Sequence, residues 1–169
     1  MSCLLHLLRP VGRAHRAPLE RLTRATGLFR EEEVATAVEL LEESLAGDDD
    51  YRFVGAFEGD HLVGYACWGP TPGTAATYDL YWIVVDRERQ GRGIGSALLA
   101  DVEQRLMTHD ARLIVVETSS RGDYAPTRGF YEARGYTRAA TVPGYYAPGD
   151  DLVIYTKDLT TGNLARTTP

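Results

Sequence analysis

The chain has 169 residues, 44% of them hydrophobic and 25% charged, which is enough for one domain whose core needs no disulfide or metal. Its net charge of -6 argues against a nucleic-acid-binding surface and fits a small cationic partner better. Neither cysteine has a partner at disulfide or zinc spacing, and the four histidines are scattered, so we expect a reducing cytoplasm and no metal. No apolar run approaches the roughly 20 residues of a membrane span, and the opening residues lack a signal-peptide cleavage pattern.

The first 50 residues predict one short strand followed by two helices. The strand covers residues 3–9, and the first helix contains Pro18, which a first helical turn tolerates. The second helix is expected within "FREEEVATAVELLEESLAG", where three glutamates complement the positive N-terminus and Gly47 can close the other end. Its apolar positions recur at helical spacing: Val34, Val38, Leu41 and Leu45.

From Tyr51 onward the pattern changes to strands. "YRFVGAF" and "HLVGYACW" are rich in β-branched and aromatic residues and predict a hairpin, and two prolines and a glycine then mark a loop over residues 69–77. A strand over residues 78–86, a helix from Ile94 and an apolar strand ending in Glu117 predict a right-handed βαβ unit with parallel strands. The four consecutive apolar residues 113–116 suit a strand covered on both faces.

The last third predicts a helix over about residues 125–134, ended by Gly135, and two strands over residues 137–142 and 152–157. Between these strands lies a loop, "PGYYAPGDD", over residues 143–151. Residues 159–169 have no apolar period and are expected to be a disordered tail. The sequence therefore predicts a single domain over residues 1–158.

Three glycines, Gly91, Gly93 and Gly95, stand on alternate positions between the predicted strand and helix in "RQGRGIGSALL". A helix N-terminus has unpaired N–H groups and a partial positive charge, so glycines there let an anion approach the backbone. The Rossmann pattern fails because Ser96 stands where its third glycine belongs, and no P-loop lysine follows. We expect a phosphate site, the alternative being a tight turn with close strand-to-helix packing.

These residues resemble a known family. Gln90-Gly91-Arg92-Gly93-Ile94-Gly95 is similar to the Q/R-x-x-G-x-G/A signature of the GNAT superfamily of acetyl-CoA-dependent N-acetyltransferases, and "FYEARGY" is similar to its "LYxxxGF" segment. The predicted order of strands and helices is also similar to that of the GNAT fold. The resemblance implies an α/β GNAT fold of the α+β type, a mixed sheet of about seven strands with flanking helices.

The resemblance also implies acetyl-CoA as cosubstrate. Its pantetheine arm would pair with the strand backbone at Ile83, Val84 and Val85. Its diphosphate would lie on the glycine-rich segment, whose members are Gln90, Gly91, Arg92, Gly93, Ile94, Gly95 and Ser96. Arg92 either adds a charge-assisted contact or is simply exposed. Many relatives carry an asparagine that contacts the cofactor seven residues before the tyrosine of the second motif; this chain departs from them with Tyr124, which is the residue expected at that contact.

Transfer to an amine needs a base and an acid, because an amine with a pKa near 10 must lose a proton before it attacks. In relatives a carboxylate at the position of Glu117 often acts as the base through water; the alternative is a pairing or capping role. Tyr131 occupies the position of the acid for the departing thiolate, the alternative being a core aromatic whose hydroxyl bonds to backbone. A backbone N–H near Val85 is the candidate oxyanion donor.

The sequence defines the amine acceptor less closely than the acetyl donor. Relatives place its specificity in the first two helices, here residues 29–33, and in the loop of residues 143–151. That loop offers Tyr145 and Tyr146 with two aspartates, either for a cationic amine or as a polar turn with inward aromatics. We expect a small-molecule or peptide amine acceptor, contact with neither nucleic acid nor membrane, and an enzyme; a homodimer is compatible with the sequence. The alternative function is a non-catalytic acyl-CoA-binding regulatory module.

Overall fold

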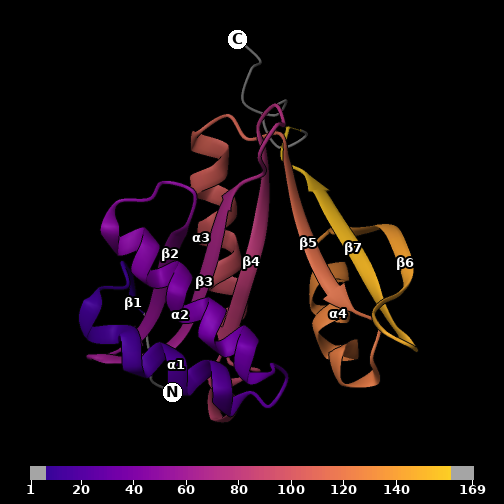
Figure 1. The fold of residues 1–169 in the computed structure, drawn as a ribbon. Coiled ribbons are helices and arrows are strands. Elements are labelled where there is room, and N and C mark those ends of the chain that lie inside the picture. Colours follow the sequence, from indigo (N-terminus) through magenta and orange to yellow (C-terminus); the bar gives the residue numbers. More distant parts are fainter. Residues whose placement is uncertain (1–6, 161–169) are drawn as a thin grey trace. The chain divides into compact units, whose positions relative to one another are not determined.

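The computed structural model describes residues 7–160, which contain seven strands and four α-helices. The hydrogen-bonded strand order is β1-β2-β3-β4-β5-β7-β6 (Figure 1). Contacts divide the chain into two compact units, residues 7–69 with 81–105 and residues 70–80 with 106–160. No helix among the described residues is long and apolar enough to span a bilayer.

Unit 1 contains β1 (Leu7–Arg9), α1 (Arg16–Ala25), α2 (Glu31–Ala46), β2 (Arg52–Glu58), β3 (His61–Pro70), most of β4 (Thr77–Val85) and most of α3 (Ile94–Thr108). Its strands carry helices on both faces (Figure 1). On one face the Tyr65 hydroxyl of β3 lies 2.7 Å from that of Thr23 in α1. On the other, an added Cβ at Gly64 would lie 3.2 Å from side-chain atoms of Ile94 and Leu98 in α3.

The core of unit 1 explains why α1 and α2 form where the sequence predicts them. Leu19 and Leu41 are completely buried, and they belong to a cluster with Phe57, Tyr65 and other apolar residues of the sheet. The apolar stripes of both helices therefore face the sheet. Gly47 ends α2 at φ 99°, which confirms the predicted C-terminal glycine.

Unit 2 contains the first residues of β4, then β5 (Leu113–Ser119), α4 (Ala125–Glu132), β6 (Thr137–Ala147) and β7 (Asp150–Asp158). Thr77–Leu80 pairs in parallel with Leu113–Val116, as the predicted βαβ unit requires. β5 differs from the prediction because its burial alternates between intermediate and buried, so it is not covered fully on both faces. It also continues two residues past Glu117.

The predicted loop over residues 143–151 is wrong, because most of it is strand. β6 runs to Ala147 and β7 begins at Asp150, with only Pro148 and Gly149 between them. Gly149 has φ 82°, and proline followed by such a glycine is the pattern of a type II turn. The disruptive residues Pro143 and Gly144 are absorbed by an irregular register between Val142 and Ala147.

The chain ends also differ from the prediction. The strand expected over residues 3–9 is β1 from Leu7 onward, and its first part lies outside the described residues. Leu159, placed in the predicted tail, is buried, and its N–H donates to the Arg112 carbonyl at 2.8 Å. The ordered chain therefore extends past residue 158. Residues 161–169 lie outside the described part.

Candidate active site

The glycine-rich segment leads from β4 into α3 in unit 1. After the 3₁₀ turn η2 (Arg87–Arg89), Gly91 and Gly93 adopt φ of 75° and 83°, a backbone region that side chains with a Cβ rarely enter. A Cβ added at either glycine would meet no atom within 4 Å. The surface above both residues is therefore open, and conformation rather than crowding accounts for these glycines.

The same segment has unused backbone donors. Within residues 7–160, no N–H of residues 91–95 donates to a backbone carbonyl, and the bond that leads into α3 joins Ala97 N to Gly93 O at 2.9 Å. The Arg92 guanidinium, in the same described part, forms no ion pair or hydrogen bond. The free N–H groups of residues 91–95 and the Arg92 guanidinium precede a 15-residue helix, and such an arrangement can bind a diphosphate. The predicted roles of Gly91 to Ser96 fit this geometry and stay predictions.

Residues 83–85 approach this segment along β4. Val84 is buried in the core of unit 1, and an added Cβ at Gly64 would lie 3.0 Å from its carbonyl oxygen, so β3 passes close at this point. The Gln90 side-chain amide donates to the Val85 carbonyl at 3.3 Å. This bond connects the start of the glycine-rich segment to the strand. The roles of Ile83, Val84 and Val85 toward a pantetheine arm stay predictions.

Glu117 lies on β5 in unit 2 and is exposed. Protein atoms around its carboxylate displace part of the water, and Asp79 adds a like charge; together they raise the pKa of Glu117 above its usual value. Asp79 pairs with Val115 in register, so it stands on the same face of the sheet as Glu117. Its carboxylate accepts a 2.7 Å hydrogen bond from Thr71.

Asp79 was missed by the sequence analysis. The available signal was an acidic residue inside the apolar strand "YDLYWIVV", where a charge needs a reason. Only the parallel register of β4 and β5 brings it beside Glu117. The charge of Asp79 therefore favours the protonated form of Glu117.

Tyr131 lies on α4 in unit 2, and its ring is buried. It stacks on Tyr155 with centroids 6.4 Å apart and meets Tyr136 and Phe130 edge to face. Burial raises the pKa of Tyr131, with a smaller contribution from Tyr124. Among the described residues its hydroxyl makes no hydrogen bond. The ring is thus part of the core, as the alternative expects, whereas the described backbone accepts no bond from its hydroxyl; the role as the acid stays a prediction.

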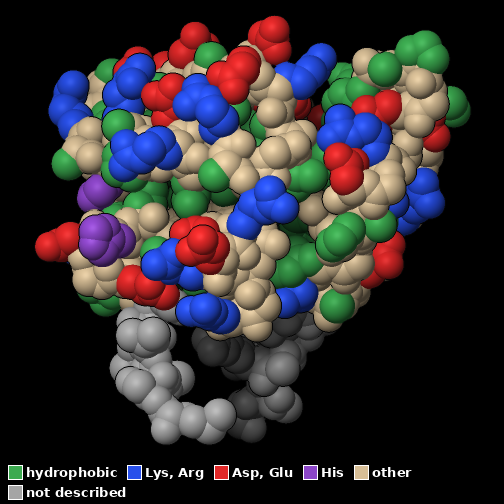
Figure 2. Space-filling view, turned by 90° about the horizontal axis from the view of Figure 1, so that it is seen from below, with side chains coloured by type: hydrophobic (Ala, Val, Ile, Leu, Met, Phe, Trp, Pro, Cys, Tyr) green, Lys and Arg blue, Asp and Glu red, His purple; other side chains and the backbone are tan. Residues whose placement is uncertain are grey.

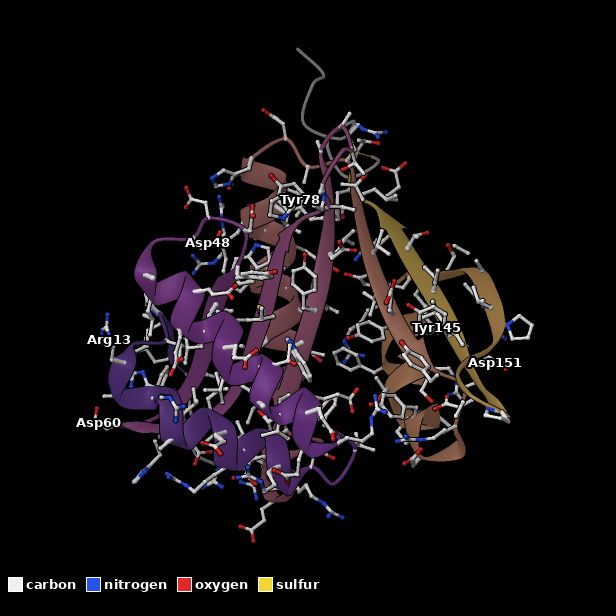
Figure 3. All side chains as sticks on the ribbon, viewed as in Figure 1. Arg13, Asp48, Asp60, Tyr78, Tyr145 and Asp151 are labelled. Atoms are coloured by element: carbon white, nitrogen blue, oxygen red, sulfur yellow. The ribbon has the colours of Figure 1, made fainter. Side chains whose placement is uncertain are left out.

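The two tyrosines proposed for the acceptor lie on β6 rather than in a loop. Tyr145, labelled in Figure 3, is 58% exposed and Tyr146 is 39% exposed, so the alternative of inward-packed aromatics is wrong. Partial burial and then the charge of Glu117 raise the pKa of Tyr146 to about 12, with smaller effects from Tyr145 and Tyr124. Glu117, Tyr124 and the β6 tyrosines therefore belong to one electrostatic neighbourhood within unit 2.

The two aspartates grouped with these tyrosines have structural contacts. Asp150 accepts a short hydrogen bond from Ser119, at the end of β5. Asp151 accepts a 2.8 Å bond from the Gly144 N–H, and its own N–H donates to Ser120 at 2.8 Å. These contacts fix the β6–β7 hairpin on the end of β5. Asp79 also accepts a hydrogen bond, from Thr71, but unlike the two hairpin aspartates it raises the pKa of Glu117.

The comparisons with known proteins agree with this geometry. A model of the acetyltransferase (GNAT) family matches residues 19–136. A solved structure from Desulfovibrio desulfuricans, described as an acetyltransferase of the GNAT family, is 43% identical, with a TM-score of 0.86 over 90% of this chain and 98% of that one.

Two further solved structures share the fold at lower identity. The ribosomal-protein-S18-alanine N-acetyltransferase from Escherichia coli is 16% identical, with a TM-score of 0.73 over 92% of this chain and 94% of that one. An aminoglycoside 6'-N-acetyltransferase complexed with coenzyme A is 21% identical, with a TM-score of 0.76 over 90% and 97%. The predicted GNAT fold is confirmed. The chain belongs to the GNAT family of acetyltransferases, and the predicted enzyme class, an acyltransferase, is confirmed with it.

Proposed function

We propose that the protein is an N-acetyltransferase that moves the acetyl group of acetyl-CoA to a primary amine, which attacks the thioester directly in a ternary complex. The observation that carries this proposal is the open row of unpaired amides at residues 91–95. Family membership supports an acetyl group as the cargo. The solved relative with coenzyme A supports the donor, and the two named N-acetyltransferases support an amine acceptor.

The glycine-rich segment binds the donor. Its amides hold the diphosphate at the positive end of α3, and Arg92 adds a charge-assisted contact. Burial of Val84 fixes the strand whose backbone at Ile83, Val84 and Val85 serves the pantetheine arm. Tyr124 completes the proposed cofactor contacts. These groups orient the thioester before any bond changes.

Glu117 accepts the proton of the acceptor amine, directly or through water, and the freed nitrogen lone pair attacks the thioester carbon. A carboxylate with a raised pKa is a stronger base than an ordinary one, which suits this step. The oxyanion that forms needs a fixed donor, for which a backbone N–H near Val85 is proposed. Tyr145 and Tyr146 contact the acceptor with their exposed faces.

Tyr131 completes the transfer. As the tetrahedral intermediate collapses, the carbon–sulfur bond breaks and the thiolate takes the proton of the Tyr131 hydroxyl. The packed ring cannot turn away, while the hydroxyl has no other hydrogen-bond partner among the described residues. Because burial keeps this phenol protonated at neutral pH, it starts each turnover as a donor.

Thiol release with acetyl-CoA tests the chemistry against a panel of amines, amino acids, polyamines and peptides. Glu117→Gln and Tyr131→Phe should each lower kcat by about a hundredfold or more, the usual loss on removing a general base or acid. Both should keep the wild-type Kd for CoA, since neither residue lies in the glycine-rich segment. Full turnover in both variants would contradict the assigned roles.

Calorimetric titration with CoA tests whether the protein binds the donor at all. Binding to the wild type is expected, and its absence would remove the basis of the proposal. Tight binding without turnover across the whole panel would favour the regulatory module instead. The two results are independent, so donor binding and catalysis are judged separately.

A further inference from the structure

An ion-paired clamp lies directly before the glycine-rich segment in unit 1. The Arg89 guanidinium contacts Glu58 of β2 at 2.8 Å through Nε, and Asp86 at 2.6 Å through an Nη. All three side chains are mostly covered, with exposed fractions of 28%, 20% and 27%. Both carboxylates raise the pKa of Arg89, so the guanidinium stays charged.

Asp86 also shapes the turn that leads into the glycines. Its second carboxylate oxygen accepts a 3.0 Å bond from the Glu88 N–H, and its own N–H donates to the Val63 carbonyl at 2.9 Å. The Arg89 N–H donates to the Asp86 carbonyl at 2.9 Å. The 3₁₀ turn is therefore fixed to β3 by backbone and to β2 by the Arg89 side chain, two residues before Gly91.

The anchor on the β2 side is itself fixed. Glu58 ends β2, next to the turn that Asp60 marks in Figure 3. Arg9 of β1 donates to the Gly59 carbonyl at 3.0 Å, pairs with Asp60 at 3.3 Å, and lies 4.1 Å over the Phe57 ring. Glu58 therefore offers Arg89 a partner that does not move freely.

Arg89 and Arg92 differ in what their charges can do. Two carboxylates already engage Arg89, whereas Arg92 has no partner among residues 7–160. We infer that Arg89 is a positioning residue: through Glu58 and Asp86 it holds residues 91–96 in the conformation that binds the donor's diphosphate, without contacting the phosphates. This inference rests on the proposed function and assigns its site a support that the sequence did not reveal.

Calorimetric titration of the 169-residue chain with CoA tests the inference. Arg89→Met should raise the Kd about tenfold, the order expected when a charge-assisted tie is lost. Arg89→Lys should recover part of the affinity, since a lysine ammonium can pair with one carboxylate but cannot bond to both as the planar guanidinium does. Arg105→Met on α3, which removes a 2.6 Å pair with Asp101, is the matched control and should keep the wild-type Kd.

Glu58→Gln separates positioning from direct contact. If Arg89 acts through the clamp, this variant should also bind CoA more weakly. If Arg89 is a phosphate ligand, releasing it from Glu58 should tighten binding, and that result would overturn the inference. Hydrogen exchange of residues 87–97 should become faster in Arg89→Met and not in Arg105→Met, while exchange in α1 and α2 stays at the wild-type rate if the fold is intact.

The outcomes also separate this inference from the proposed function. A wild type that binds no CoA contradicts both. A wild type that binds CoA, with Arg89→Met and Glu58→Gln equal to it, contradicts the clamp alone.

Discussion

At the scale of single residues, the site depends on how neighbours alter ordinary side chains. Glu117 is an ordinary exposed glutamate of β5 until the register of β4 and β5 puts Asp79 on its face of the sheet. Tyr131 is a core aromatic by packing and a candidate acid only because its hydroxyl lacks a partner in the described chain. In both cases the residue type was predictable, and the property that matters comes from residues distant in sequence.

The Asp79 carboxylate should appear in the pH dependence of kcat/KM. Glu117 must lose its proton to act as a base, so activity should rise with pH through its pKa, above the ordinary carboxyl value. Asp79→Asn removes the like charge and should move this acidic limb to lower pH, while an amide can still accept the Thr71 bond.

Tyr146→Phe is the control for that measurement. With its pKa near 12, Tyr146 is neutral over the whole acidic limb, so its removal should leave the limb where it is. An unchanged limb in Asp79→Asn would show that the two carboxylates are not coupled.

At the scale of elements, the glycine-rich segment and the β6–β7 hairpin were predicted with different success. The helix after Gly93 has a clear apolar period, and its bounds follow from that pattern. The hairpin was misassigned because Pro143 and Gly144 suggest a loop, although the turn lies at Pro148 and Gly149. Local composition cannot show that a bulge absorbs the first pair, since the ladder with β7 decides it.

Gly93→Ala tests the conformational argument for the segment. With φ at 83° and no atom within 4 Å, the new methyl group strains the backbone without a collision. The Kd for CoA should rise by about tenfold if the strain, roughly 1–2 kcal/mol, shifts the loop away from its binding form.

Gly47→Ala is the matched control, because Gly47 has φ 99° and an equally open surrounding at the end of α2. Both variants should lose similar thermal stability, and only Gly93→Ala should lose affinity. Equal affinities in the two variants would contradict the amide cradle.

At the scale of the whole molecule, the net charge of -6 favours a cationic amine acceptor only in a general way. Acidic and basic side chains are mixed over the face seen in Figure 2, without a large region of one sign. Exposed charges also pair on the surface of unit 1, as Arg24 does with Glu31 at 2.9 Å, and such pairs stabilise little. The cytoplasmic location stays a prediction, and the sequence is compatible with a homodimer without predicting one.

Donor binding should be visible in global stability. A ligand that binds only the folded chain at a hundredfold excess over its Kd adds about 2.7 kcal/mol to the free energy of unfolding. CoA should therefore raise the Tm of the wild type in a concentration-dependent way, measured by calorimetry. The same concentration should raise the Tm less in Gly93→Ala, and an unchanged wild-type Tm would contradict donor binding.

The sequence by itself determined the family, the order of elements and the position of the phosphate segment. These depend on local patterns, namely apolar periods and glycines at a strand-to-helix junction. A short stretch of neighbouring residues contains each such pattern in full. The tertiary structure alone decided which charges face one another. Three features join elements that are separate in the sequence: Asp79 on the sheet face of Glu117, the Glu58–Arg89–Asp86 clamp, and the anchored aspartates of the hairpin. Register and packing, not spacing along the chain, decide which charged groups face one another in each case.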